Sequence, residues 1–256
     1  MNLPKGHLPE EKCISVVDRI AKAGFEKINF AGGEPTLCRW LPNLIMQAKN
    51  HGMVTSIVTN GSRITNQWLG DLQRSLDWIA LSIDTIDPEK LKRLGRAIGG
   101  NTPISEEEYL RIVSDIKQHG IRLKINTVVT SVTWQDDFTN FIRLAKPERW
   151  KLLQALPVKG QNDVHITDFM ISTEQFEAYV ERNRTIENDG IRVVPESNEL
   201  MTESYVMIDP AGRFFDNTQG TYTYSQPILE VGVEKALDEV LINTERFHER
   251  GGSYDW

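Results

Sequence analysis

The sequence predicts an α/β protein whose parallel strands are joined by crossover helices and close partly into a barrel. Two observations lead to this prediction. Segments with helical apolar spacing alternate with short β-type segments through the first 156 residues. The β-type segment 27–31 also runs directly into the turn Gly32-Gly33-Glu34-Pro35, and ligands of such sheets bind where the strands end. The 256 residues suffice to bury a large core.

The first predicted helix runs from Pro9 to Gly24, because Ile14, Val17 and Ile20 recur at helical spacing and glycine ends the pattern. Helix-type and strand-type patterns then alternate. The predicted order is strand 27–31, helix 40–51, strand 53–59, helix 65–75, strand 78–84, helices 87–94 and 105–119, strand 121–129, helix 136–146 and strand 149–156. These are five barrel-type strands, and the chain begins on a helix.

After residue 158 the rhythm changes. A polar stretch precedes a predicted amphipathic helix at 173–186, and the remaining elements are β-type segments near 191–194, 204–208 and 212–215, a helix near 232–240 and a tail from Arg250. We therefore divide the chain into a barrel core, residues 1–157, and a C-terminal extension, residues 158–256, that completes and covers the active site.

The composition excludes several classes of function. A net charge of −7 argues against nonspecific binding of nucleic acid. No apolar run approaches the length of a membrane span and the amino terminus lacks a signal-peptide core, so we expect a cytoplasmic protein. The only cysteines, Cys13 and Cys38, are too few for a disulfide scaffold, and we assign no metal ligands in this chain.

Basic side chains lie inside the predicted strands. Lys-Ile-Asn occurs twice, and since side chains alternate along a strand, the lysine and asparagine share one face while isoleucine points to the helices. The same rule places two cations around Trp150 on one face. The predicted inner-face residues are Lys27, Asn29, Lys124, Asn126, Arg149 and Lys151. Enclosed cations need counter-charges, either protein carboxylates or an anionic ligand such as a polyphosphate.

Polar residues also follow the predicted strands. The two glycines of the Gly32–Pro35 turn allow close approach of the backbone, and an ammonium group would find acceptors in main-chain carbonyls and in Glu34. Asn60, Ser62 and Ser82 stand at the ends of the next two strands, where a ligand could meet them. Ordinary turn chemistry is the alternative, because Asn-Gly is a strong turn former.

Together these segments resemble the viperin family of radical S-adenosylmethionine (SAM) enzymes. The resemblance runs over nearly the whole chain and is carried by KINFAGGEP (27–35), IVTNGS (57–62), IALSID (79–84), Gly95-Arg96, KINT (124–127), RWKLLQ (149–154), PESN (195–198), Ser204-Tyr205 and RGG (250–252). GGEP alone points only to radical SAM enzymes, whereas the later motifs are specific to viperin-like proteins.

The resemblance implies a partial (β/α)6 radical SAM barrel, here lacking its first strand, that binds SAM and a [4Fe-4S] cluster. It implies an enzyme of lyase type that converts a ribonucleoside triphosphate (CTP, UTP or GTP) to its 3′-deoxy-3′,4′-didehydro analogue, a chain terminator in antiviral defence. It further implies an electron donor for the cluster, and we expect a monomer.

Residue roles follow from the same resemblance. SAM would be bound by Gly32, Gly33, Glu34, Asn60, Ser62, Ser82 and Arg96, with Arg96 on the SAM carboxylate. The triphosphate would be bound by Lys27, Asn29, Lys124, Asn126, Arg149, Lys151 and Arg250, with Arg250-Gly251-Gly252 as a lid that closes over the phosphates. Tyr205 corresponds to the family tyrosine thought to quench the product radical.

One departure from the family is large. The sequence contains no CxxxCxxC cluster motif, and we expect the chain to begin just after the family's cluster loop. Two alternatives therefore stay open. The first is a nucleotide-binding protein without cluster or catalysis. The second is a phosphate-binding barrel aldolase or isomerase that uses Lys124 as a Schiff-base nucleophile.

Overall fold

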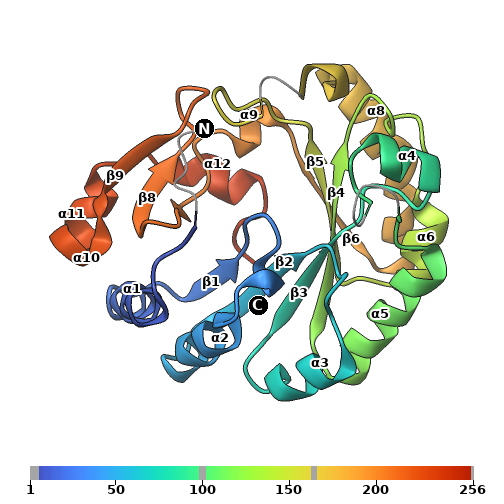
Figure 1. Ribbon diagram of the computed structural model, residues 1–256. Coiled ribbons are helices and arrows are strands. Elements are labelled where there is room, and N and C mark those ends of the chain that lie inside the picture. The colour runs from blue at the N-terminus through green and yellow to red at the C-terminus, as the bar shows by residue number, and fades with distance from the viewer. Residues whose placement is uncertain (1–5, 98–101, 163–165, 255–256) are drawn as a thin grey trace.

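The centre of the fold is a curved sheet of six parallel strands with helices around its outer side (Figure 1). The structure is a computed structural model that describes residues 6–97, 102–162 and 166–254. The strands pair in chain order: β1 (Lys27–Phe30), β2 (Val54–Thr59), β3 (Trp78–Ser82), β4 (Arg122–Val129), β5 (Arg149–Gln154) and β6 (Arg192–Glu196). The α/β prediction is confirmed.

The number of strands differs from the expectation. We predicted five parallel strands and regarded 191–194 as a short β segment of the extension, but β6 pairs in parallel with β5 along its whole length. The reason for the error is local. A polar stretch and helix α8 (Thr173–Asn183) separate β5 from β6, so the helix-strand rhythm of the preceding segments is interrupted before β6. The main sheet thus draws on residues on both sides of position 158.

The outer helices begin and end largely where their capping residues predict. They are α1 (Glu10–Lys22), α2 (Leu41–Asn50), α3 (Asn66–Leu72), α4 (Pro88–Arg93), α5 (Glu106–Gln118), α6 (Thr139–Ala145) and α8. Ser105 caps α5, and Ser172 with Gln175 forms a capping box on α8. The predicted helix 173–186 stops as an α-helix at Asn183 and continues as a 3₁₀ segment, Arg184–Asp189.

The C-terminal region adds a small antiparallel sheet and short helices. Its elements are α9 (Asn198–Met201), β7 (Met207–Ile208), β8 (Arg213–Asp216), β9 (Thr223–Pro227), α10 (Ile228–Val231), α11 (Val233–Asp238) and α12 (Thr244–Glu249). We did not predict α9, β9 or α12. The predicted helix near 232–240 is confirmed as α11, and Gly232, at φ 89°, separates it from α10, which we did not predict.

Two apolar clusters hold these layers together. The larger lies between the outer face of the main sheet and its helices and includes Ile57, Ile79, Ile125 and Trp150, each fully buried. The smaller joins α1 and α2 to the C-terminal elements through residues such as Val17, Phe214, Ile228 and Ala236. This second cluster fixes the extension against the start of the sheet.

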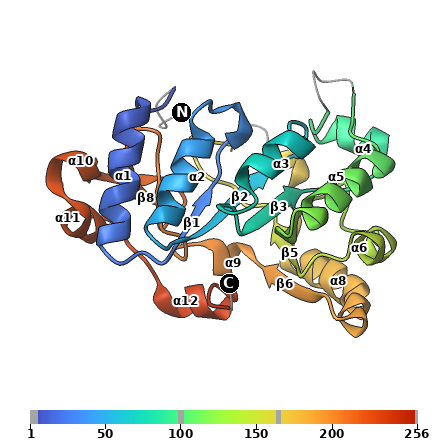
Figure 2. The same ribbon diagram turned by 90° about the horizontal axis from the view of Figure 1, so that it is seen from below.

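The last helix has a different place from the others. Seen from below, α12 lies on the opposite side of the sheet from α1, α2 and α3 (Figure 2). The residues that follow α12 therefore reach the inner face of the sheet, which the outer helices leave open.

Candidate functional site

The inner face of the main sheet carries the predicted basic and amide side chains. Lys124 on β4 is the register partner of Arg149 on β5, and two residues further along Asn126 is the partner of Lys151. Between them, Ile125 and Trp150 point the other way into the core. The alternation that we used to assign the two faces is thus confirmed for these strands.

The two predicted subsites meet on this face. Ser82, predicted to contact SAM, is the register partner of Asn126, predicted to contact substrate, and Asn126 in turn partners Lys151. These three residues form a row across β3, β4 and β5, towards the carboxyl end of the sheet. A ligand on this row can contact groups from both predicted sets.

A first cluster of cations gathers around Tyr254. The Nζ atoms of Lys27 and Lys124 both donate hydrogen bonds to the Tyr254 hydroxyl. The Arg149 guanidinium lies over the Tyr254 ring, 3.8 Å from its centre, and donates to the Gly251 carbonyl at 3.0 Å. The Tyr254 ring also meets Trp78 edge-on at 6.0 Å. Tyr254 is a functional candidate that sequence reasoning missed, because no pattern distinguishes a tyrosine in the tail.

The lysines of this cluster have strongly lowered pKa values. Burial lowers the pKa of Lys124 to about 5, and the positive charge of Lys27 acts in the same direction. Burial likewise lowers the pKa of Lys27 to about 8. Both values reflect the cost of holding positive charges together out of water. An anionic ligand would reverse this effect and favour the protonated forms.

A second cluster forms around the buried carboxylate of Glu196. Glu196 Oε1 lies 2.5 Å from Lys151 Nζ and 3.3 Å from Arg250 Nη1, and Oε2 accepts a hydrogen bond from the Tyr205 hydroxyl. The Arg250 guanidinium stacks on the Tyr205 ring at 3.7 Å and donates to the Ser204 carbonyl at 2.8 Å. Lys151 and Arg250 therefore have a protein counter-charge, which is the first of the two possibilities we raised for enclosed cations.

Glu196 was also missed as a site residue, although its motif was noted. Its signal was present in the alternation of β6, where Val194 and Glu196 share the face of Lys151. Glu196 and Lys151 also affect the pKa of Tyr205. Burial raises this pKa, the positive charge of Lys151 lowers it, and the carboxylate of Glu196 raises it further. The phenol therefore keeps its proton at neutral pH.

The predicted lid residue Arg250 is buried. Only 6% of its surface is exposed, and its contacts to Glu196 and Ser204 make it part of the wall between α12 and β6. Four buried polar atoms on the inner face lack a protein partner in the described structure, namely Trp78 Nε1, Asn126 Oδ1, Arg149 Nε and Arg250 Nε. Buried polar atoms without partners are uncommon and are typical of positions that a ligand or water completes.

The Gly32–Pro35 turn is held by Glu34. The Glu34 carboxylate accepts hydrogen bonds from Thr36 N and Oγ1, at 3.1 and 2.6 Å, from Thr59 Oγ1 at 2.8 Å and from Asn60 N at 2.9 Å. It thus ties the turn after β1 to the end of β2. Gly32 has φ 139°, and a Cβ added at Gly32 or Gly33 would meet no atom within 4 Å, so the backbone of the turn is accessible.

The other predicted SAM contacts are engaged locally. Asn60 Oδ1 accepts from Ser62 N at 2.8 Å, which is the turn chemistry we named as the alternative. Arg96 pairs through Nε with the buried carboxylate of Asp84 at 2.8 Å, while half of its side-chain surface stays exposed. Asp84 in turn accepts from Val128 N at 2.8 Å and so fixes Arg96 beside the end of β4.

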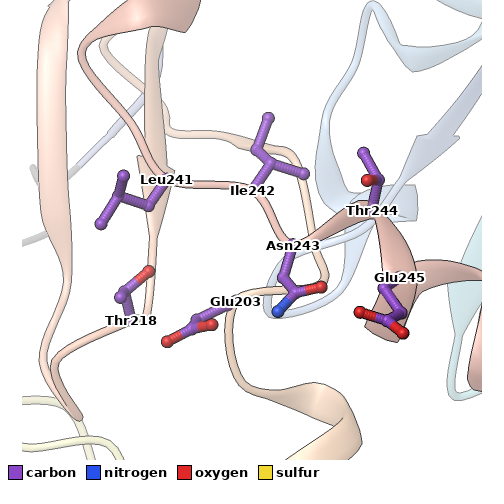
Figure 3. Close-up of a pocket in the computed structure, with 7 residues that line it drawn as sticks. All are labelled: Glu203, Thr218, Leu241, Ile242, Asn243, Thr244 and Glu245. Carbon is purple, nitrogen blue, oxygen red and sulfur yellow. The ribbon is translucent and has the colours of Figure 1, made fainter.

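A separate surface pocket of about 400 Å³ lies beside the start of α12 (Figure 3). Its lining includes Glu203, Thr218, Asn243 and Glu245, and it contains none of the predicted site residues. In Figure 3 the acidic and amide side chains that line this pocket do not all point toward one common centre. We therefore place the functional site on the inner face of the sheet.

The described part of the chain shows no group of three or more His, Cys, Asp or Glu residues placed to hold a metal ion. Cys13 and Cys38 are both free thiols. In the same residues, no helix is long and apolar enough to cross a lipid bilayer.

Comparison with known proteins gives consistent matches. Residues 2–145 match the model of the radical SAM superfamily. Two curated proteins named S-adenosylmethionine-dependent nucleotide dehydratase are similar along 99% of this chain: one from Lacinutrix mariniflava is 52% identical and one from Flammeovirga pacifica is 48% identical. The chain spans 52% of the length of the former and 86% of the latter. The Danio rerio dehydratase RSAD2 is 33% identical over 97% of the chain and 70% of its own length.

Solved structures support the fold. The structure of anSMEcpe with bound AdoMet and Kp18Cys peptide aligns with a TM-score of 0.68 at 16% identity, covering 95% of this chain and 74% of that one. Streptococcus suis SuiB bound to S-adenosylmethionine aligns with a TM-score of 0.59 at 17% identity, covering 81% and 52%. At these identities the likeness concerns the fold alone.

Proposed function

This chain belongs to the radical SAM superfamily and, within it, to the S-adenosylmethionine-dependent nucleotide dehydratases, and on this premise we propose that it binds SAM and a ribonucleoside triphosphate on the inner face of its sheet. The proposed reaction converts CTP, UTP or GTP to the 3′-deoxy-3′,4′-didehydro analogue, a chain terminator in antiviral defence. The names of the relatives support a nucleotide as substrate.

The observation that carries the proposal is that basic residues lie next to each other on the adjacent strands β4 and β5. Lys124 and Arg149 are register partners, and two residues further along the strands Asn126 is the register partner of Lys151. Two buried cations side by side are unfavourable in a protein without an anion to bind. A polyphosphate supplies several oxygens that accept from lysine and arginine at once. Lys27 and Asn29 on β1 and Arg250 after α12 complete the proposed set.

For SAM we propose the carboxyl ends of β1, β2 and β3, next to the proposed triphosphate contacts. The accessible backbone of Gly32 and Gly33 suits the methionyl ammonium, with Glu34 holding the turn in shape. Arg96 is exposed enough to bind a carboxylate while Asp84 fixes its position. Asn60, Ser62 and Ser82 lie at the ends of β2 and β3 and complete the proposed contacts.

A [4Fe-4S] cluster is standard for the superfamily, but the residues described here do not fit one. Three thiolates must converge on a cluster, and the sequence has two cysteines, Cys13 and Cys38. We therefore derive no step through the cluster from this structure. An electron donor, a monomeric state and a cytoplasmic location stay predictions of the resemblance and the composition.

Tyr205 is the proposed group that quenches the product radical. Its raised pKa keeps the phenol protonated, so that the O–H bond is available to donate a hydrogen atom. Glu196, Lys151 and Arg250 fix the ring and hydroxyl from three directions. A tyrosine held in this way can face a bound ribose in one orientation.

The direct test is binding, followed by turnover. Calorimetric titration of this chain with CTP, UTP, GTP and ATP should show binding of at least one triphosphate, and Lys124→Ala and Lys151→Ala should weaken it. A longer form of the protein that includes a CxxxCxxC motif and carries a reconstituted cluster should then produce 5′-deoxyadenosine and a dehydrated nucleotide from SAM, reductant and the preferred triphosphate. Failure of all four nucleotides in both assays would rule out the proposal.

The two alternatives predict other results. A nucleotide-binding protein without catalysis is not favoured, because the relatives are named as dehydratases. A Schiff-base enzyme finds support only in the lowered pKa of Lys124, which an amine nucleophile requires. Borohydride trapping of a carbonyl substrate on Lys124 would favour that reading, and unchanged activity of Lys124→Arg would exclude it.

A further inference from the structure

The Tyr254 hydroxyl connects two strands that are not neighbours in the sheet. It accepts hydrogen bonds from Lys27 on β1 and from Lys124 on β4, and β2 and β3 lie between these strands. Long lysine side chains have many rotamers in solution. An acceptor common to both amino groups holds them beside one oxygen atom and so limits this freedom.

The Tyr254 ring adds a second interaction with the same cations. The Arg149 guanidinium lies 3.8 Å from the ring centre, Lys27 Nζ 4.3 Å and Lys124 Nζ 4.5 Å. The electron-rich face of an aromatic ring attracts cations, yet the ring carries no net charge. It therefore favours positive charge on these three side chains without the neutralisation that Glu196 provides to Lys151 and Arg250.

The two glycines after Arg250 bring Tyr254 to this position. Gly251 has φ 70°, and a Cβ there would lie 3.3 Å from Arg149 Nη2. A Cβ on Gly252 would lie 2.5 Å from the Phe247 carbonyl oxygen and from its ring, closer than real contacts allow. Glycine is thus required at both positions for the chain to turn after α12 and to reach the inner face.

We propose that Tyr254 is a positioning residue of the anion site, which holds the amino groups of Lys27 and Lys124 and the Arg149 guanidinium in place for the phosphates of a nucleoside triphosphate. This inference rests on the proposed function and assigns a role to a residue outside the predicted site. A tyrosine suits the role because a carboxylate at this point would compete with the phosphates for the same donors.

Proton uptake supplies a readout specific to this role. The charged and titratable groups that face Lys124 are Lys27, Arg149, Lys151 and Tyr254, and Arg122 acts in addition on Lys27. Since burial and these cations lower the pKa values of Lys124 and Lys27, binding of an anion should draw protons from the buffer. The hydroxyl accepts from both amino groups and thereby favours their protonated forms. Lys124, with a pKa of about 5, is already unprotonated at pH 7.5, whereas Lys27, with a pKa of about 8, is mostly protonated. Removing the hydroxyl should therefore leave less Lys27 protonated before binding and raise the number of protons taken up.

The test compares Tyr254→Phe with a matched control, Tyr222→Phe. Tyr222 is also partly buried, and it packs on Phe215 beside the small sheet. Each protein is titrated with CTP, UTP, GTP and inorganic tripolyphosphate, in two buffers of different ionisation enthalpy at pH 7.5, and separately with SAM. We expect Tyr254→Phe to weaken triphosphate and tripolyphosphate binding about tenfold, the usual size for a hydrogen bond to a charged group. Proton uptake should rise, and SAM binding should stay within twofold of the parent.

Each other outcome has a defined meaning. Parent-like affinity and proton uptake in Tyr254→Phe would overturn the positioning role while leaving the proposed function intact. Equal weakening of SAM and triphosphate, or an effect of the same size in Tyr222→Phe, would show that the substitution acts through general stability and would also overturn it. Absence of triphosphate binding by the parent chain would instead remove the proposed function, and the inference with it.

Discussion

Lys124 and Arg149 are direct register partners on β4 and β5, and both are buried, with 7% and 5% of their surfaces exposed. Side chains at partner positions on one face of a sheet lie close together, so two positive groups at such a pair repel each other. The protein tolerates the repulsion by lowering the pKa of Lys124 and by placing the Tyr254 ring beside both residues.

The stability of the protein should depend on the ionisation of Lys124. Its folded-state pKa is about 5, whereas a lysine in the unfolded chain titrates near its ordinary pKa of 10.5. Between these values the unfolded chain binds more protons, so the free energy of unfolding should rise with pH from about 5 to about 10. Lys124→Met removes the titrating group and should flatten this rise and stabilise the protein most at pH 6. Urea denaturation at several pH values measures both effects. An unchanged slope in Lys124→Met would contradict the assignment.

Removing the charge of Glu196 should destabilise the fold and alter Tyr205. Glu196→Gln leaves Lys151 and Arg250 without their carboxylate, and breaking a buried pair in this way costs about 3–5 kcal/mol. The carboxylate also contributes to the raised pKa of Tyr205, so that pKa should fall. Urea denaturation gives the first quantity, and phenolate absorbance, with Tyr205→Phe as the reference, gives the second. Glu199→Gln, on the exposed side of α9, is the control and should change neither.

Loss of the Glu34 carboxylate should disturb the conformation of the Gly32–Pro35 turn. In Glu34→Gln one acceptor oxygen becomes an NH2 group that faces donors from Thr36, Thr59 or Asn60. We expect a loss of about 1–3 kcal/mol in the free energy of unfolding, the cost of leaving such groups unsatisfied. SAM affinity should fall with it. Glu26→Gln, an exposed position just before β1, should behave as the parent in both denaturation and SAM titration.

Arg96 should act on SAM and not on the nucleotide. Arg96→Gln removes the proposed partner of the SAM carboxylate, and SAM affinity should fall about tenfold, as for loss of a charge-assisted hydrogen bond. Triphosphate binding should be unaffected, since Lys124 and Arg149 are unchanged. Arg93→Gln, near the end of α4, is the matched control. A parallel loss of both ligands in Arg96→Gln would indicate that its pair with Asp84 supports the sheet as a whole.

The residues on the inner face of the sheet were predictable because the alternation of side chains along a strand alone decides which of them point inward. Strand alternation places Lys124 and Asn126 opposite Ile125, and the register confirms this. The sixth strand was not counted because its five residues follow the change of rhythm after residue 158 and resemble the short β segments of the extension. Glu196 could have been found by applying alternation to that strand. Tyr254 could not, since its contacts to Lys27 and Lys124 depend on a turn that no local pattern predicts.

The hydrogen bond between Lys27 and Tyr254 joins residues 227 positions apart in the chain. Contacts of such large sequence separation close long loops and form slowly, after the local helix and strand pairings that lie between them. The main sheet is built from neighbouring strands in chain order, so it can assemble stepwise without the tail. In refolding experiments, triphosphate binding should therefore recover later than the far-ultraviolet circular dichroism signal of the barrel. A partly folded protein with a complete sheet would lack the arrangement of lysines on which nucleotide recognition depends.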